Sequence, residues 1–225
     1  MVEKIHPPQL VTNARMLYFC WVPADPFGAA SMLPEGLEPA HNQAIFINQY
    51  VVDSDAYTSH FGAYSLTYMG LDLDGLDIDE NTPGRYWTHY FNSNERMRVY
   101  AKDKGIPALS GKTDLQIKNS ILVATTYSEN GVAIIRSTVK ISNKISDQVR
   151  GHLRYITLHD GQLESGRYAY VGSIDSSFEI LSLEFLEPSH SCYKLRPADP
   201  LKVTFGFYSP SSSFCYPGGI ETLKK

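Results

Sequence analysis

The feature that most constrains this chain is a succession of short runs rich in β-branched and aromatic residues, which continues from one end to the other. Glycine, asparagine, aspartate and proline separate many of these runs, for example at 128–131, 159–161 and 199–201. Many short strands at close spacing predict an antiparallel β-barrel or a folded double sheet. Strands are predicted over 16–22, 44–52, 63–71, 85–92, 96–101, 121–127, 132–142, 153–159, 167–174, 177–187 and 201–209.

Two of these runs show the alternation of a strand with two different faces. In VAIIRSTVKIS (132–142) apolar residues occupy one face and polar residues the other. In RYWTHYFN (85–92) both faces are partly polar and partly aromatic, which predicts a strand that lines a cavity on one side. One of those faces consists of Arg85, Trp87, His89 and Phe91.

Helical patterning is scarce, and one short helix is predicted over Asp25–Leu33. Asp25 is a good N-cap, and Pro26 fits the first helical position because its missing N–H is not needed there. Pro34 and Gly36 end the segment. No internal repeat or change in composition divides the chain, so we expect one domain over residues 1–225.

Composition and charge exclude several classes of protein. The 225 residues carry a net charge of −4 and include no basic run, so no nucleic-acid partner is expected. No apolar run is long enough to span a membrane, and the N-terminus has no signal-peptide core. Cys20, Cys192 and Cys215 are widely spaced, as expected for reduced thiols in a cytoplasmic protein. No His, Cys, Asp and Glu set has metal-ligand spacing, so neither a metal nor a cofactor is predicted.

The stretch GIPALSGKT (105–113) resembles a phosphate-binding loop but does not fit one. Five residues separate Gly105 from Gly111, whereas that loop requires four. The run that follows is rich in β-branched residues and predicts a strand, not the helix whose N-terminus would hold a phosphate. A different role is therefore expected for this stretch.

The order of motifs resembles the acetoacetate decarboxylase family. The motifs that carry the resemblance are ARMLYFCWVPAD (14–25), MLPEGLEP (32–39), GAYSLTY (62–68), GRYWTHYFNSNERMRVYAKDKG (84–105), the PALSG loop and a long hairpin over 113–142. The resemblance implies a mainly β fold, namely a cone-like antiparallel barrel with an enclosed pocket and one or two short helices. It also implies a small-molecule substrate and a symmetric homo-oligomer.

The chain departs from the family at the positions that resemblance assigns to chemistry. The PALSG loop corresponds to the loop that carries the Schiff-base lysine, and here that position and its cationic neighbour are Ala108 and Leu109. The pocket carboxylates of the family correspond to Leu66 and Asn48. Without an amine no imine can form, so decarboxylation by the family mechanism is not expected. Lys104 and Lys112 are the alternative amines, and we interpret both as solvated loop lysines.

The candidate catalytic residues are Arg15, His89 and Asn48. Arg15 falls on the arginine that the family places near the substrate carboxylate, and a guanidinium suits bidentate carboxylate binding. The alternative for Arg15 is a structural ion pair, for example with Glu95. His89 suits an acid or base, and its alternative is a buried structural histidine. The candidate substrate-binding residues are Tyr18, Tyr64, Leu66, Trp87, Ala108 and Leu109, of which the tyrosines are alternatively plain wall residues.

The sequence therefore predicts a Schiff-base-free enzyme that acts on an enolisable or polyketide-like metabolite by isomerisation, cyclisation, hydration or elimination, in secondary metabolism. A lyase or isomerase of the cyclase type is favoured. The first alternative is a barrel that binds a small ligand without catalysis, which aromatic walls would serve equally well. The second alternative is a β-keto acid decarboxylase that uses a displaced lysine.

Overall fold

The structure is a computed structural model, and it describes residues 4–80, 82–142, 144–145, 147–175, 177–216 and 218–223. Strands dominate it, with two short α-helices and two single 3-10 turns (η1, η2). In chain order the elements are β1 (Gln9–Trp21), α1 (Pro26–Ala30), β2 (Ile45–Val52), η1 (Asp55–Tyr57), β3 (Tyr64–Asp72), β4 (Gly84–Asn92), α2 (Glu95–Lys102), β5 (Ala108–Lys118), β6 (Ile121–Ser128), β7 (Ala133–Lys140), β8 (Asp147–His159), β9 (Gln162–Asp175), β10 (Glu179–Phe185), η2 (Ser191–Leu195), β11 (Val203–Tyr216) and β12 (Glu221–Thr222).

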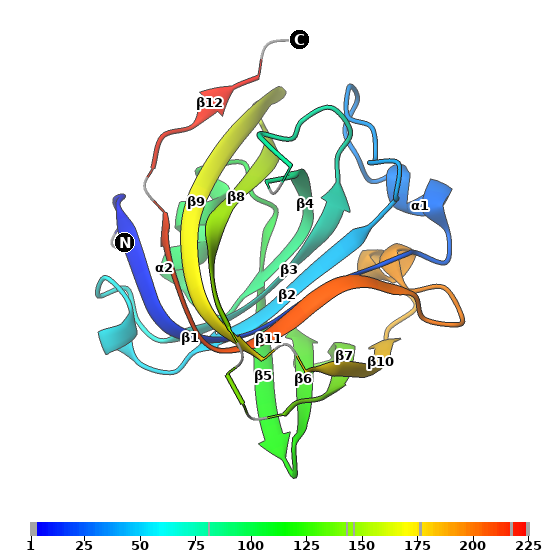
Figure 1. Cartoon of the computed structure of the whole chain (residues 1–225). Coiled ribbons are helices and arrows are strands. Elements are labelled where there is room, and N and C mark those ends of the chain that lie inside the picture. Colours follow the sequence, from blue (N-terminus) through cyan, green and yellow to red (C-terminus); the bar gives the residue numbers. More distant parts are fainter. Residues whose placement is uncertain are drawn as a thin grey trace.

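Seven of the described strands close a barrel in the order β4-β3-β2-β1-β11-β9-β8 (Figure 1). The ring closes where β8 returns to β4 in a short parallel pairing of 84–86 with 154–156. The other neighbours within the ring are antiparallel. Five described strands lie outside the ring: β5, β6, β7 and β10 extend the sheet from β4, and β12 pairs with β9. The predicted mainly β, antiparallel barrel is confirmed.

The barrel wall separates two apolar clusters. Alternate residues of β1 and β2, such as Tyr18 and Phe46, point into the barrel. Their neighbours in sequence, such as Phe19 and Ile47, point outwards and pack beneath the sheet formed by β5, β6, β7 and β10. Because both faces of these strands are covered, their sequences read as continuous apolar runs.

Of the two α-helices, the sequence predicted the first correctly and misread the second as a strand. Helix α1 begins as predicted, with the Asp25 Oδ1 accepting a hydrogen bond of 2.9 Å from the Gly28 N–H, although it ends earlier, at Ala30. The strand predicted at 96–101 is wrong, because this segment is helix α2. The Asn94 side chain caps that helix by accepting a hydrogen bond of 3.1 Å from the Met97 N–H. No helix in the described part of the chain is long and apolar enough to cross a membrane.

A β-bulge in β4 changes which side chains face the barrel interior. Met69 of β3 pairs with His89, but the next residue, Gly70, pairs with Trp87, so Thr88 is an extra residue. Gly70 permits this approach, because a Cβ there would lie 1.7 Å from the Tyr86 carbonyl oxygen. The predicted common face of 85–92 is therefore wrong. Arg85 and Trp87, which precede the bulge, point into the barrel, whereas His89 packs on the outside beside Phe91.

Candidate functional site

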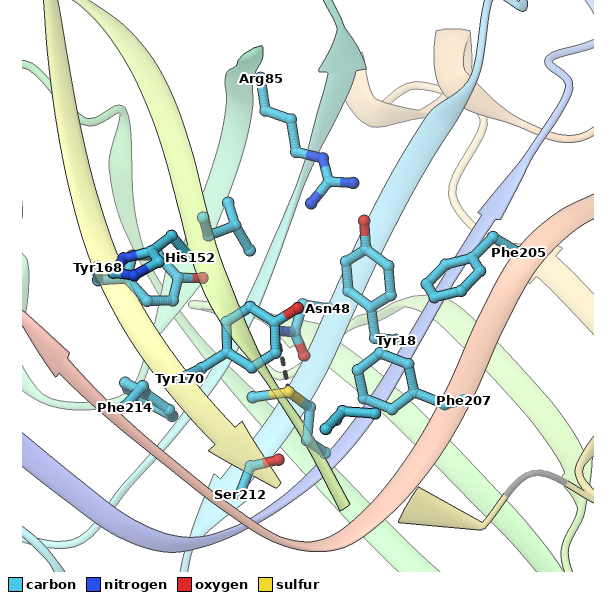
Figure 2. Close-up of a pocket in the computed structure, with 13 residues that line it drawn as sticks. Tyr18, Asn48, Arg85, His152, Tyr168, Tyr170, Phe205, Phe207, Ser212 and Phe214 are labelled. Carbon is cyan, nitrogen blue, oxygen red and sulfur yellow. Dashed lines mark hydrogen bonds between the residues drawn. The ribbon is translucent and has the colours of Figure 1, made fainter. Parts of the chain in front are cut away.

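The barrel encloses a cavity of about 130 Å³ on the side formed by β1, β8, β9 and β11 (Figure 2). A cavity of this size holds roughly a benzene-sized molecule. Its walls are mainly aromatic, with a small number of polar groups. The lining residues are Met16, Tyr18, Asn48, Arg85, Val149, His152, Leu153, Tyr168, Tyr170, Phe205, Phe207, Ser212 and Phe214.

Arg85 is the cation of this cavity, and the sequence reasoning did not select it. Its side chain is 12% exposed, and its Nε–H donates a hydrogen bond of 2.8 Å to the Asp72 Oδ1. Its guanidinium carbon lies 5.3 Å from the ring centroid of Tyr18 and 5.1 Å from that of Phe46. Burial alone lowers the pKa of Arg85, but Tyr18 and Asp72 raise it by more, so the group stays charged.

The two terminal nitrogens of Arg85 donate no hydrogen bond to any described residue. The ion pair with Asp72 therefore holds the guanidinium in place through Nε and leaves its outer edge free. In Figure 2 this edge points into the cavity, toward Asn48 and the Tyr170 hydroxyl. A planar pair of N–H donors suits a carboxylate or an enolate oxygen.

Asn48 supplies an acceptor at the floor of the cavity. It is 2% exposed, and its Nδ2 donates to the Tyr68 hydroxyl at 2.8 Å and approaches the Met16 sulfur at 3.4 Å. The Tyr68 hydroxyl in turn lies 2.7 Å from that of Tyr168. These contacts fix the orientation of the amide and leave its Oδ1 without a partner among the described residues. A buried, unpartnered oxygen indicates a site for a ligand donor or an ordered water.

The mouth of the cavity lies beside the exposed residues Phe205 and His152. Phe205 is 58% exposed and packs edge-on against Phe207, at 6.1 Å between ring centroids. Phe207 stacks on Tyr18 at 5.5 Å. This arrangement joins the mouth to the inner wall by a continuous aromatic surface, along which an apolar ligand could extend.

The opposite half of the barrel, here called the filled half, is packed with aromatic side chains around Trp87 that do not line the cavity. Trp87 stacks between Tyr68 at 4.6 Å and Tyr155 at 4.7 Å, with Tyr90 at 5.7 Å. Tyr64 is 3% exposed, and its hydroxyl bonds to that of Tyr50 at 2.9 Å. Leu66 and Ala108 pack into the same interior cluster but do not line the cavity.

The predicted site residues are thus divided among three places. Tyr18 and Asn48 line the cavity. Four others lie in the filled half, and Leu109, 46% exposed, lies on the outer surface. The residues in the filled half are Tyr64, Leu66, Trp87 and Ala108.

The remaining two predicted catalytic residues, Arg15 and His89, face away from the cavity. Arg15 binds Asp53 through two hydrogen bonds of 2.7 and 2.8 Å, and its Nη1 donates to the Leu115 carbonyl oxygen. The structural ion pair weighed for Arg15 therefore exists, with Asp53 in place of Glu95. Strand alternation places Arg15 outside, because its neighbours Ala14 and Met16 point inwards.

No lysine is among the residues that line the cavity. Lys112 is exposed on β5, and Lys104 is half-buried with its carbonyl accepting a hydrogen bond from the Thr157 hydroxyl. The described residues contain no group of three or more His, Cys, Asp or Glu side chains that could hold a metal ion. All three cysteines are free.

Comparison of the sequence with protein-family profiles and with curated proteins gives no match. Comparison of the structure with solved structures gives several. An acetoacetate decarboxylase superposes with a TM-score of 0.70 at 12% identity, covering 98% of this chain and 91% of the other. The acetoacetate decarboxylase of Legionella pneumophila subsp. pneumophila gives a TM-score of 0.68 at 13% identity, covering 100% and 90%.

Two further matches carry other names. The enduracididine biosynthesis enzyme MppR complexed with pyruvate has a TM-score of 0.66 at 13% identity and covers 100% of this chain and 92% of its own. An acetoacetate decarboxylase-like enzyme from Sphingomonas wittichii RW1 has a TM-score of 0.60 at 14% identity, covering 98% and 94%. At these identities the likeness concerns the fold. The chain therefore has the acetoacetate decarboxylase fold over nearly its whole length.

Proposed function

We propose that this protein is an enzyme with the acetoacetate decarboxylase fold that acts without a Schiff base on a small, enolisable carboxylate. The observation that carries the proposal is the pairing of a charged Arg85 edge with the unpartnered Asn48 Oδ1 in one small aromatic cavity. These two groups would bind an anionic oxygen and a hydroxyl or amide donor of the same ligand. The volume of about 130 Å³ favours a ligand of about six non-hydrogen atoms.

The reaction class we propose is an isomerisation or elimination through an enol or enolate. A preorganised cation contributes most where negative charge develops in the transition state, and Arg85 is held rigidly by Asp72 and Tyr18. Tyr170 offers a hydroxyl on the opposite side of the same space (Figure 2). A larger, polyketide-like substrate would have to extend through the mouth past Phe205. A role in secondary metabolism is proposed by analogy with the enduracididine biosynthesis enzyme.

Hydrogen–deuterium exchange at the methyl group of pyruvate tests this proposal. Pyruvate is a small 2-oxo acid whose methyl protons exchange through the enol. We expect the wild-type protein in D₂O to accelerate the exchange, followed by proton NMR, and we expect Arg85→Gln to abolish the acceleration. The control is Arg15→Gln, which removes a guanidinium from the outer surface and should exchange at the wild-type rate. Equal exchange with Arg85→Gln would contradict the proposal.

A non-catalytic binding barrel is the second candidate, and one observation favours it. The lining contains no carboxylate, and its one imidazole, that of His152, stands on the exposed rim. A cavity without a well-placed base could hold a ligand and leave it unchanged. Binding of pyruvate without accelerated exchange in the same NMR experiment would favour this candidate.

Decarboxylation by a displaced lysine is tested separately. Neither Lys104 nor Lys112 lines the cavity, so no imine is expected there. The protein is incubated with acetoacetate, reduced with borohydride and analysed by intact mass spectrometry. A reduced covalent adduct mapped to either lysine would show that an imine forms and would contradict the proposal. An unchanged mass would support the proposal. Native spectra of the untreated protein would also detect any co-purified ligand.

A further inference from the structure

A second cluster of reactive groups lies outside the barrel, where His89 meets the turn η2. The His89 Nε2 lies 2.9 Å from the Ser191 Oγ, and the His89 Nδ1 lies 3.0 Å from the Thr88 Oγ1. The imidazole is 4% exposed, whereas Ser191 is exposed. Three groups are therefore linked in a row: the exposed hydroxyl of Ser191, the buried imidazole of His89, and the hydroxyl of Thr88, which orients the imidazole.

A hydrogen bond from Thr88 to the backbone of β3 fixes the tautomer of His89. The Thr88 hydroxyl also lies 3.1 Å from the Met69 carbonyl oxygen, which can only accept a hydrogen bond. The single Thr88 proton must go to that carbonyl if all three contacts are hydrogen bonds. The Nδ1 of His89 then carries its proton and donates to Thr88, and its Nε2 is left as an acceptor for the Ser191 hydroxyl. This is the arrangement that activates a serine nucleophile.

The bulge in β4 creates this arrangement. Without the extra residue Thr88, strand alternation would turn His89 into the barrel with Trp87. With it, His89 points outwards and meets η2, which follows β10 in sequence. Burial lowers the pKa of His89 to about 3, with a smaller contribution from His190. The imidazole is therefore neutral, with a free Nε2 lone pair, throughout the physiological pH range. The same low pKa makes it a weak base, so it can assist only reactive substrates.

An open groove adjoins the pair and gives it room for a substrate. The groove measures about 380 Å³ and includes both His89 and Ser191 in its lining. Its walls are mainly apolar, formed by Met32, Ile106, Pro107 and Leu109, and Leu109 is 46% exposed. Lys102 stands at its exposed edge. An apolar acyl group fits the walls, and the ammonium group favours a negatively charged acyl chain or a developing oxyanion.

We propose that Ser191, with His89 as its base and Thr88 as the positioning residue, is a second reactive site that accepts acyl groups from small esters. The Ser191 hydroxyl proton moves to the His89 Nε2 as Oγ bonds to the ester carbonyl carbon. The alcohol leaves with that proton, and water then cleaves the acyl-serine to release the acid. The base has no carboxylate behind it, so activated esters are the expected substrates. This site does not depend on the function proposed for the barrel cavity.

Covalent labelling tests the proposal. The full-length protein is treated with a fluorophosphonate probe and, separately, with p-nitrophenyl acetate, and the adducts are located by intact and peptide mass spectrometry. We expect one label, at Ser191, which Ser191→Ala abolishes. The matched control is Ser189→Ala, which removes another exposed hydroxyl two residues away and should label as the wild type does. Labelling at other residues, or at an equal rate in Ser191→Ala, would overturn the proposal.

Variants of the two supporting residues separate catalysis from structure. His89→Gln should slow labelling about 100-fold, the lower end of the range for loss of a general base. Thr88→Val should slow it less, and Thr88→Ser should restore the wild-type rate because it keeps the hydroxyl. Each variant is first shown to keep its thermal unfolding transition. A rate unchanged in folded Thr88→Val or His89→Gln would mean that the contacts only anchor η2 to the barrel.

Discussion

The two halves of the barrel interior use the same kinds of residue for opposite purposes. In the half around Trp87, rings stack face to face and tyrosine hydroxyls bond to one another, and the cavity does not extend into this half. In the half around Arg85, rings line a cavity of about 130 Å³ that also contains Asn48, whose Oδ1 has no partner among the described residues. The filled half also has one unpartnered buried polar atom, the Trp87 Nε1, so the cavity is what distinguishes the two halves. The first half stabilises the barrel, and the second half holds the groups a ligand would meet.

This comparison also places Ala108, the residue that the sequence resemblance matches to a Schiff-base lysine. Ala108 belongs to the filled half, where its Cβ packs beside the aromatic cluster, and its backbone pairs with Tyr90. Ala108 does not line the barrel cavity, although it does line the open groove outside the barrel. The cavity lies against the opposite wall, and the cation in its lining is Arg85.

The largest difference between the halves should appear in stability. Trp87→Ala should lower the free energy of unfolding by about 3–5 kcal/mol, because the ring is fully buried and its neighbours cannot all collapse into the void. Phe207→Ala, at the half-buried wall of the cavity, should cost only about 1 kcal/mol. Denaturant unfolding measures both. Equal costs would show that the two halves are packed alike.

A lysine placed at the family position should not restore the family chemistry. Ala108 is 2% exposed, so Ala108→Lys must displace aromatic rings or leave a buried amine, at a cost of about 2–4 kcal/mol. Leu109→Lys, at an exposed neighbouring position, should be nearly neutral. Urea unfolding gives both costs, and borohydride trapping with acetoacetate should leave both variants unmodified. An imine in Ala108→Lys would show that ligands do reach the filled half.

Alkaline pH should reveal the tyrosines of the filled half. Burial raises the pKa of Tyr50 and Tyr64 well above the ordinary value of 10. A raised folded-state pKa means that the stability from these groups is complete below pH 10 and is lost as the pH rises above it. Phenolate absorbance at 295 nm should therefore lag behind free tyrosine and then rise together with unfolding, followed by circular dichroism. Full titration near pH 10 in a folded protein would contradict this.

The smallest stability effect is expected at Asn48. Asn48→Leu removes the unpartnered Oδ1, and the Tyr68 hydroxyl keeps its bond to Tyr168. The free energy of unfolding should change by no more than about 1 kcal/mol in either direction. Pyruvate affinity, measured by calorimetry, should fall roughly tenfold. Unchanged affinity with lower stability would show that Asn48 stabilises the barrel and does not bind the ligand.

The fold could be predicted from the sequence because strands, turns and helix ends are each marked by residues close together in the chain. Alternation and turn residues located nearly every barrel strand, and Asp25 with Pro26 located the start of α1. The segment 96–101 was misread because β-branched and aromatic residues there suggested a strand. The signal for a helix was the cap: Asn94 precedes Glu95 in the first turn.

The site was harder to predict because it depends on register. His89 and Arg85 share a face in a regular strand, and one inserted residue at Thr88 separates them. Arg85 lies directly opposite Asp72 in the β3–β4 pairing, a cross-strand pair that becomes visible only once that register is known. Gly70, a glycine within a strand, was the local signal that the pairing is irregular.

The function proposed for the barrel requires that Arg85, and not Arg15, binds a carboxylate in a cavity whose lining contains no lysine. The most direct measurement is calorimetric titration of pyruvate into the wild type, Arg85→Gln and Arg15→Gln, with Arg85→Gln/Asp72→Asn included so that no buried carboxylate is left unpaired. We expect both Arg85 variants to lose affinity by about 10- to 100-fold and Arg15→Gln to bind as the wild type does. Loss of binding in Arg15→Gln, with full affinity in the Arg85 variants, would contradict this expectation.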